Sequence, residues 1–371
     1  MRRRPFSLAH EREVELLRRV LEPCTEVGQP VHAGALVGAA EYHNVLVHLL
    51  AAQQEGRLHL REYTRRRAVG LAGRRAVFAR VLRRELPALV GTLERACGAE
   101  PVLIKGPAVA DRYYPDPALR QFVDLDLLVP ATRLADAAAS LESEGYTVAG
   151  EFRRGYAERY GHDLHAARPG RRRIDVDLHW RVGDDPAASA LDHAWAAEGG
   201  ERLTVEGASV LVPRPARQLL VLGVHLLRDP EKKLGSVNDV ALVAAALSED
   251  EWELAFADAD SQGLGWALHR ALDYAEFQLG YVRPRPGAGG PPPAFGPLRA
   301  IEELDLPAAR HIGWLAALPW RERARYLGMV LVPDRDSLAA RSGAEASLAR
   351  QIVRHGGRAL RGMGLLGRRG R

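Results

Sequence analysis

Cysteine is nearly absent from this chain: only Cys24 and Cys97, two of its 371 residues, are of this type. Their spacing fits no zinc motif, and they build no disulfide framework, so we expect a reducing compartment. Apolar runs of about 20 residues, the length of a membrane-spanning helix, are also missing. We therefore expect a cytoplasmic protein with no membrane partner.

Aromatic residues are scarce as well, at 6%, although hydrophobic residues as a whole make up 47% of the chain. That share is ample for a sizeable core, and the prevalence of Ala, Leu and Arg favours helices. A chain of this length usually holds two or three domains, or one core with large extensions.

Lysine is the scarce basic residue, because Lys105, Lys232 and Lys233 are the only lysines among 52 basic residues. The net charge of +5 belongs to residues 350–371, which hold seven arginines and no acid, so that without them it is −2. This basic tail would contact nucleic acid, an acidic peptide or a membrane surface, or it would form a solvated basic helix. The solvated helix is favoured over a nucleic-acid partner.

The order of elements predicts an α+β fold, in which a small mixed-sheet core is flanked by helical regions. Helical spacing of apolar residues dominates near both ends, whereas strands and helices alternate between them. The predicted regions are an N-terminal helical region at 1–98, a core at 99–213, a C-terminal helical region at 214–349 with a Pro/Gly linker at 283–297, and the basic tail at 350–371.

Individual elements follow from the same patterns. Helices are expected at 11–21, 39–53, 57–97 with Leu86-Pro87 as a candidate break, 108–114, 131–145, 321–329 and 348–360. Strands are expected at 101–104, 123–129, 146–151, 163–168, 173–179 and 205–211, with a hairpin turn at 169–171.

Two carboxylates stand two residues apart in an otherwise apolar run. Because strand side chains alternate between faces, Asp124 and Asp126 should share one face, while Val123, Leu125 and Leu127 point toward a core. Like charges this close repel each other and are costly to bury, and a divalent cation removes that cost. Mg²⁺ suits the position, since it prefers oxygen ligands and substrate phosphates. The alternative is a solvated edge strand.

A short strand upstream ends in a Lys105-Gly106 turn, and a helix begins at the proline that follows. A strand, a glycine turn and a helix N-terminus together form a cradle for phosphate groups, to which Lys105 would add a positive charge. Alternatively, this lysine extends from a strand end into solvent. Arg120 would reach a phosphate, or pair with Asp116 or Asp124.

A second predicted strand carries Asp175, Asp177 and His179 on one face and apolar residues on the other. One of its carboxylates would complete a three-carboxylate, two-metal site of the kind used for displacement at phosphorus. Spacing alone leaves both Asp175 and Asp177 as candidates for the third ligand.

Histidines cluster around this second strand, where His162 and His165 precede it and His179 ends it. No cysteine supports a zinc site, so we expect these side chains to form hydrogen bonds around an active cleft. Trp180 is expected to fill the core rather than to stack on a base.

The order and spacing of these segments resemble a family of largely uncharacterised bacterial nucleotidyltransferases within the DNA polymerase beta-like nucleotidyltransferase superfamily. The resemblance covers most of the chain and is weak at both ends. His225 and Asp239 match helical signatures that come later in the family. The segments that carry the resemblance are Leu103-Ile104-Lys105-Gly106, Tyr114-Pro115-Asp116-Pro117-Ala118-Leu119-Arg120, Asp124-Leu125-Asp126-Leu127-Leu128-Val129 and Asp177-Leu178-His179-Trp180.

The resemblance implies a catalytic metal centre. It identifies Asp124 and Asp126 as ligands of Mg²⁺, with two ions expected, and Asp177 as the third carboxylate. Asp177 would also lie near the attacking oxygen and serve as its base.

The resemblance further implies an NTP as co-substrate, held at its phosphates by Lys105, Gly106 and Arg120. Most members of the superfamily place Gly-Ser at the first turn, where the serine hydroxyl helps to hold a phosphate. This chain has Lys105-Gly106 there instead, and lysine holds a phosphate as a point charge.

Three functions agree with these patterns. The first is a Mg²⁺-dependent nucleotidyltransferase that moves an NMP from an NTP to a small molecule, peptide or metabolite and releases pyrophosphate. The second is a non-catalytic nucleotide-binding protein, against which the presence of all three carboxylates counts. The third is a nucleotide-transferring toxin that acts on tRNA or protein. Serine hydrolysis is not supported, because the sequence lacks a Gly-x-Ser-x-Gly motif.

Overall fold

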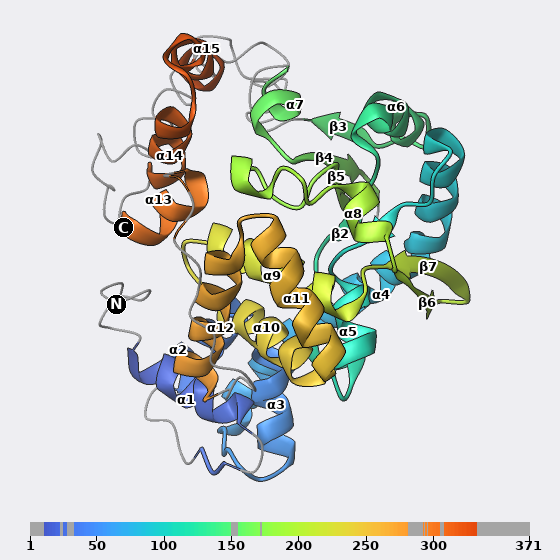
Figure 1. The fold of residues 1–371 in the computed structure, drawn as a ribbon. Coiled ribbons are helices and arrows are strands. Elements are labelled where there is room, and N and C mark those ends of the chain that lie inside the picture. Colours follow the sequence, from blue (N-terminus) through green and yellow to red (C-terminus); the bar gives the residue numbers. More distant parts are fainter. Residues whose placement is uncertain are drawn as a thin grey trace.

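A mixed seven-stranded sheet lies at the centre of the computed structural model, which describes residues 11–22, 25–27, 33–149, 155–170, 173–280, 296–304 and 308–331, with Pro292 and Ala294 (Figure 1). The strand order is β3-β4-β5-β2-β1-β7-β6, and β2 runs parallel to β5 and β1 parallel to β7. The strands are β1 (Val102–Leu103), β2 (Leu125–Leu128), β3 (Thr147–Ala149), β4 (Asp163–Arg168), β5 (Ile174–His179), β6 (Glu201–Val205) and β7 (Ala208–Val212).

Predicted and observed strands agree closely in the middle of the sheet, where β4 spans the predicted residues and β5 differs by one. The strand predicted at 205–211 is confirmed from residue 208 by β7, but its first part was wrong, since the chain forms a hairpin with β6 there. Its two-residue turn, Glu206 and Gly207, has φ values of +48° and +81°. Positive φ at both turn residues matches the twist of the flanking strands and so favours a tight hairpin.

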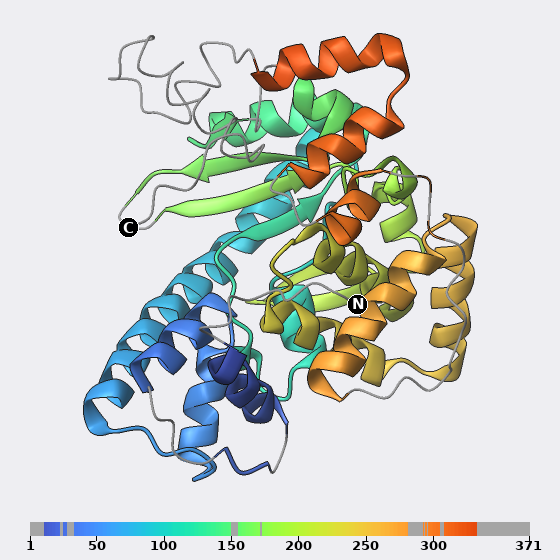
Figure 2. The ribbon, with the colours of Figure 1, turned by 90° about the vertical axis from the view of Figure 1, so that its left-hand side faces the viewer.

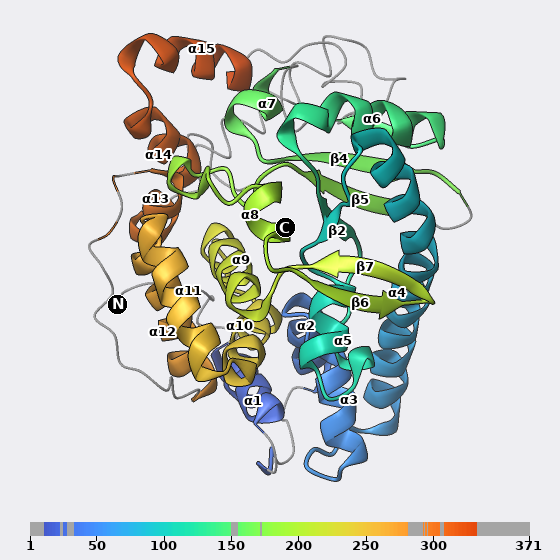
Figure 3. The same cartoon turned by 45° about the vertical axis from the view of Figure 1, so that its right-hand side comes forward.

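One face of the sheet is covered by α4 (Glu62–Cys97) and by α6 (Leu134–Ser143), which follows the short 3-10 helix η3 (Ala131–Arg133) (Figure 3). The predicted break at Pro87 was wrong, because α4 continues through this residue. An internal proline costs a helix about 3 kcal/mol. Burial of the leucines around it, which join the core under the sheet, offsets that cost: Leu82, Leu86, Leu89 and Leu93.

The opposite face of the sheet packs against a bundle of helices (Figure 3). Val102, Ile104 and Leu128 point into this second core. The helices of the bundle are α9 (Pro215–Arg228), α10 (Leu234–Ala246), α11 (Glu249–Ser261) and α12 (Gly265–Leu279). The sheet therefore carries an apolar core on each side, as the alternation of its strands requires.

Three helices near the N-terminus share one core with the first half of α4: α1 (Glu11–Leu21), α2 (Ala33–Tyr42) and α3 (Leu46–Gln54) (Figure 2). The single helix predicted at 39–53 was wrong, since the chain turns between α2 and α3. Asn44 lies in this turn with a φ of +59°, a left-handed conformation that ends a helix and that asparagine tolerates.

A group of aromatic residues, among them Tyr160, Trp314 and Tyr326, joins α7 (Tyr156–Tyr160) to α14 (Ala309–Ala317) and α15 (Trp320–Leu331) (Figure 1). The prediction of a helix at 321–329 is confirmed by α15. The remaining elements are α5 (Pro107–Tyr113), η2 (Pro117–Leu119), η4 (Pro186–Ala188), α8 (His193–Ala197) and α13 (Pro297–Glu303).

The fold class is confirmed: a mixed sheet with helices before and after it forms an α+β fold. The predicted helix at 348–360, the basic tail, Cys24 and most of the 283–297 linker lie outside the described residues. Among the residues that are described, no helix is both long and apolar enough to cross a membrane.

Candidate active site

The carboxylates of two neighbouring parallel strands meet at the candidate site. Asp126 of β2 and Asp177 of β5 are register partners, so their side chains leave the same face of the sheet side by side. Ligand atoms of Asp126, Asp177 and His179 all lie within 4.8 Å of one another. The structure thus brings together two of the carboxylates that the sequence singled out.

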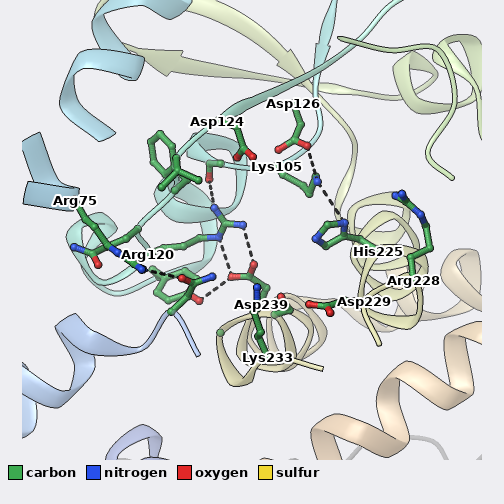
Figure 4. Close-up of a pocket in the computed structure, with 18 residues that line it drawn as sticks. Arg75, Lys105, Arg120, Asp124, Asp126, His225, Arg228, Asp229, Lys233 and Asp239 are labelled. Atoms are coloured by element: carbon green, nitrogen blue, oxygen red, sulfur yellow. Dashed lines mark hydrogen bonds and ion pairs between the residues drawn. The ribbon is translucent and has the colours of Figure 1, made fainter. Parts of the chain in front are cut away.

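Asp124 lies immediately before β2 and lines the same cavity as Asp126. The two carboxylates are drawn side by side in Figure 4. Val123 was predicted to point toward a core, and this prediction was wrong, because the side chain is 51% exposed. The strand begins only at Leu125, so alternation does not apply to Val123.

Asp126 is almost completely buried, and two polar groups contact its Oδ1 atom. Lys105 Nζ lies 2.5 Å from this oxygen and His179 Nε2 lies 3.1 Å from it. The lysine also lies 3.4 Å from Nδ1 of His225, which α9 brings to the cavity. Lys105, in the strand-end turn, therefore links this carboxylate to a histidine of the helical bundle (Figure 4).

These neighbours push the protonation equilibria of the two carboxylates in opposite directions. Burial, followed by the charge of Asp126, raises the pKa of Asp124 to about 7. Burial also acts to raise the pKa of Asp126, but Lys105 and His179 outweigh it and hold the pKa well below the usual range. At neutral pH Asp126 is therefore charged, whereas Asp124 is only partly deprotonated.

Asp175 is held away from this pair. Arg173 Nε lies 2.7 Å from its Oδ1 atom, and His165 Nε2 lies 3.0 Å from the same atom. His165 Nδ1 lies 2.9 Å from Asp177 Oδ1, so this half-exposed imidazole bridges the two carboxylates of β5. The geometry therefore brings Asp177, and not Asp175, to Asp126.

A cavity of about 440 Å³ opens beside the carboxylates (Figure 4). Its wall combines residues of α4, of the turns after β1 and η2, and of α9 and α10. The charged residues among them are five cations and four carboxylates: Arg75, Lys105, Arg120, Arg228, Lys233, Asp124, Asp126, Asp229 and Asp239.

Arg120 is fixed by contacts within the protein. Its Nε and Nη2 atoms donate to the two oxygens of Asp239, at 2.9 and 2.8 Å, and its Nη1 donates to the carbonyl of Gly106 at 3.0 Å. Tyr114 donates its hydroxyl to the same Asp239, at 2.7 Å. Arg120 therefore pairs with Asp239 rather than with Asp116 or Asp124, and it ties the Gly106 turn to α10.

Sequence reasoning missed three of the cations in the cavity wall. Arg75 comes from α4, Arg228 ends α9, and Lys233 caps α10. They lie far from the carboxylate motifs along the chain, and arginine is too common here to stand out. The scarcity of lysine was the available signal, since two of the three lysines line this cavity.

The histidine prediction is confirmed for His165 and His179, which contact Asp177 and Asp126. His162 is buried, and its Nδ1 lies 3.0 Å from Oδ1 of Asp163. His162, Asp163 and His179 form a second set whose ligand atoms lie within 4.8 Å of one another, so they too could hold a metal ion. The core position predicted for Trp180 is confirmed, because the side chain is buried in the core under α4.

The fold and the site together define a mixed α/β protein with an acidic cluster beside a cation-lined cavity. The chain belongs to a family described as uncharacterised nucleotidyltransferases, whose model matches residues 29–280. That range includes every residue of the cavity wall. A comparison with curated proteins finds no match.

Proposed function

We propose that this chain is a Mg²⁺-dependent nucleotidyltransferase of the polymerase beta-like superfamily. An acceptor oxygen attacks the α-phosphorus of an NTP, the bond to the β-phosphate oxygen breaks, and pyrophosphate leaves. The observation that carries this proposal is the register of Asp126 and Asp177 on parallel strands beside a cation-lined cavity. Membership in a nucleotidyltransferase family supports it independently.

The donor set fits Mg²⁺, because Asp124, Asp126 and Asp177 offer only carboxylate oxygens, the ligand type this ion prefers. These three side chains would hold the metal, and two bound ions would neutralise the charge that develops on the transferred phosphate. Both contacts to Asp126 are made to Oδ1. The hydrogen bond to this side chain in the described part of the chain is likewise made to Oδ1, so Oδ2 accepts none there and can take a ligand.

The residues proposed to hold the nucleotide lie around the turn after β1. Lys105 would place its ammonium beside a phosphate, and the Gly106 turn would let the backbone approach it closely. Arg120 would act indirectly, because its hydrogen bond to the Gly106 carbonyl fixes the shape of that turn. Asp177 would lie next to the attacking hydroxyl and accept its proton.

Transfer is tested with α-labelled NTPs, Mg²⁺ and separate panels of hydroxyl-bearing metabolites, peptides and tRNA. Asp126→Asn should abolish labelling of the acceptor and release of pyrophosphate, whereas Asp136→Asn, at an exposed carboxylate of α6, should leave both unchanged. Equal activity of wild type and Asp126→Asn would contradict the proposal. Labelling confined to tRNA or to a protein would identify a toxin-like target, and NTP binding without transfer to any acceptor would identify a non-catalytic binding protein.

A further inference from the structure

Two cations of the cavity wall, Arg228 and Lys233, stand at the end of α9 and in the turn that leads to α10. Each is supported from behind by a buried carboxylate. The supporting contacts reach α13 and α14, which lie beyond the residues that match the family model.

Asp184 supports the first cation. It is 1% exposed, and its Oδ1 lies 3.1 Å from Nε of Arg228 while its Oδ2 lies 2.5 Å from Nε of Arg310 on α14. The neighbouring Asp185 accepts a hydrogen bond from the backbone nitrogen of Leu298 on α13, at 2.7 Å. The segment behind Arg228 is thus attached to both helices.

Glu302 of α13 supports the second cation through the residue next to it. Its Oε1 lies 2.7 Å from Nζ of the buried Lys232, and its Oε2 lies 2.9 Å from Nε of Arg270. Lys232 also donates to the carbonyls of Leu227 and Asp229, at 2.9 and 2.8 Å. These bonds hold Lys232 at a φ of +46°, a left-handed conformation that sets the direction of the chain at Lys233.

The balance of charge favours an anion at this wall. Inside the cavity, Asp126 and Asp239 pair with Lys105 and Arg120. Behind the wall, each buried carboxylate faces two cations: Asp184 faces Arg228 and Arg310, and Glu302 faces Lys232 and Arg270. The carboxylate nearest to Lys233 Nζ is that of Glu231, at 3.8 Å and half exposed, where water weakens the attraction. Two wall carboxylates remain: Asp124, a proposed ligand of Mg²⁺, and Asp229, which accepts a hydrogen bond from the backbone nitrogen of Glu231.

We propose that Arg228 and Lys233 bind the polyphosphate chain of the nucleotide, and that α13 and α14 hold both cations in place through Asp184 and Glu302. The ligand class is a linear polyphosphate, because it offers several anionic oxygens to cations spread along one wall. Arg228 and Lys233 are binding residues, whereas Asp184 and Glu302 are positioning residues. The inference rests on the proposed function.

Calorimetric titration with inorganic tripolyphosphate in Mg²⁺ tests the binding residues without knowledge of the base or the acceptor. Lys233→Gln and Arg228→Gln should each weaken tripolyphosphate binding by about tenfold to a hundredfold, the range for a lost charge-assisted contact. AMP, which lacks the β- and γ-phosphates, should bind all forms equally. Unchanged tripolyphosphate affinity in both variants would overturn the proposal.

The positioning role is tested with a matched pair on α13. Glu302→Gln should weaken tripolyphosphate binding several-fold, whereas Glu303→Gln, which alters an exposed pair with Arg299, should have no effect. If Glu302 acts through Lys233, the double variant Glu302→Gln, Lys233→Gln should bind no more weakly than Lys233→Gln alone. Additive losses in the double variant would contradict this route.

A second variant covers the case in which Glu302→Gln does not fold. Arg310→Gln, at a partly exposed side chain, leaves Asp184 to neutralise Arg228 alone and should weaken tripolyphosphate binding, while Arg310→Lys should restore most of it. Failure of Arg310→Lys to restore binding would overturn this part. Tripolyphosphate binding that depends on Lys233 in a protein without transfer activity would contradict the proposed function only, and absence of tripolyphosphate binding in wild type would contradict both.

Discussion

At the scale of single residues, two neighbouring carboxylates of the site differ in the contacts that they make. Asp175 and Asp177 are two residues apart on the same face of β5 and share His165 as a neighbour. Asp175 is paired with Arg173, whereas Asp177 is the register partner of Asp126. Position in the register, rather than residue type, therefore separates a proposed ligand from a structural ion pair.

Substitution of these two carboxylates should have unequal effects. Asp177→Asn should lower the rate of nucleotide transfer by about a hundredfold or more, because it removes a ligand of the proposed metal. Asp175→Asn should retain most of the activity, since its partner Arg173 is exposed to solvent. Steady-state rates at saturating Mg²⁺ measure both. The reverse order of activities would move the third ligand from Asp177 to Asp175.

The pKa of Asp124, raised to about 7, gives the metal-free protein a defined dependence on pH. The folded state holds a proton that the unfolded chain releases at its ordinary pKa of 3.8, so the stability gained from this group is lost as pH rises from about 4 through 7. The proposed Mg²⁺ would replace that proton, and its binding should therefore stabilise the protein more at pH 8 than at pH 5.

Thermal unfolding with and without Mg²⁺ at the two pH values measures this difference. Asp124→Asn carries no titrating carboxyl at this position, so its stabilisation by Mg²⁺ should be smaller and nearly independent of pH. An equal gain from Mg²⁺ at pH 5 and pH 8 in the wild type would contradict the assigned role of Asp124.

Residue-level prediction from sequence succeeded where the motif was local. Alternation along one strand placed Asp177 and His179 on a shared face, and the strand–turn–helix pattern placed Lys105 at the cavity. Asp239 was known only by resemblance, and its partner Arg120 lies 119 residues away. Pairings over such distances depend on how helices pack on a sheet, which spacing along the chain does not encode.

At the scale of elements, the turn between β1 and α5 depends on Gly106. Its φ of +60° and ψ of −121° are accessible to glycine and strained for any residue with a Cβ atom. Gly106→Ala should lower the free energy of unfolding by about 1–3 kcal/mol, because the strain is local and inescapable. Urea unfolding measures this loss, and NTP titration should show weaker binding, since the turn carries Lys105.

Gly73 is the matched control for this substitution. It lies in the helix α4, is exposed, and has no atom within 4 Å of the position that a Cβ would take. Gly73→Ala should stabilise the protein by about 0.5–1 kcal/mol, because alanine restricts the unfolded chain and favours helix. If both variants shifted the free energy of unfolding in the same direction, the argument from Gly106 would be wrong.

Element prediction succeeded where periodicity was strong and missed three local exceptions, at Asn44, Pro87 and Glu206. The helix at 11–21 has the predicted bounds, and the strand at 173–179 begins one residue later than predicted. Pro87 did not break α4 because packing under the sheet outweighs local propensity. The β6–β7 hairpin was missed because one of its turn residues is Glu206, a type that rarely takes a positive φ.

At the scale of the whole molecule, we expect the basic tail at 350–371 to contribute nothing to the proposed nucleotide site. Truncation before Arg350 should leave Mg²⁺ and NTP binding unchanged, because the proposed contacts all lie earlier in the chain. Affinity for tRNA should fall and its salt dependence should flatten only if the acceptor is a nucleic acid, since up to seven cationic contacts would be lost. Titration with tRNA at two salt concentrations decides between these outcomes, and a loss of NTP binding on truncation would contradict this expectation.

The cavity wall is assembled from segments that are far apart in the order of synthesis. Lys105 meets His225 across 120 residues, and Arg120 meets Asp239 across 119. A nascent chain that has not yet emerged from the ribosome as far as α9 carries its acidic strand, but it has neither of these partners. The proposed nucleotide chemistry would thus begin only once α10 has been made, and a chain interrupted before that helix would be inert.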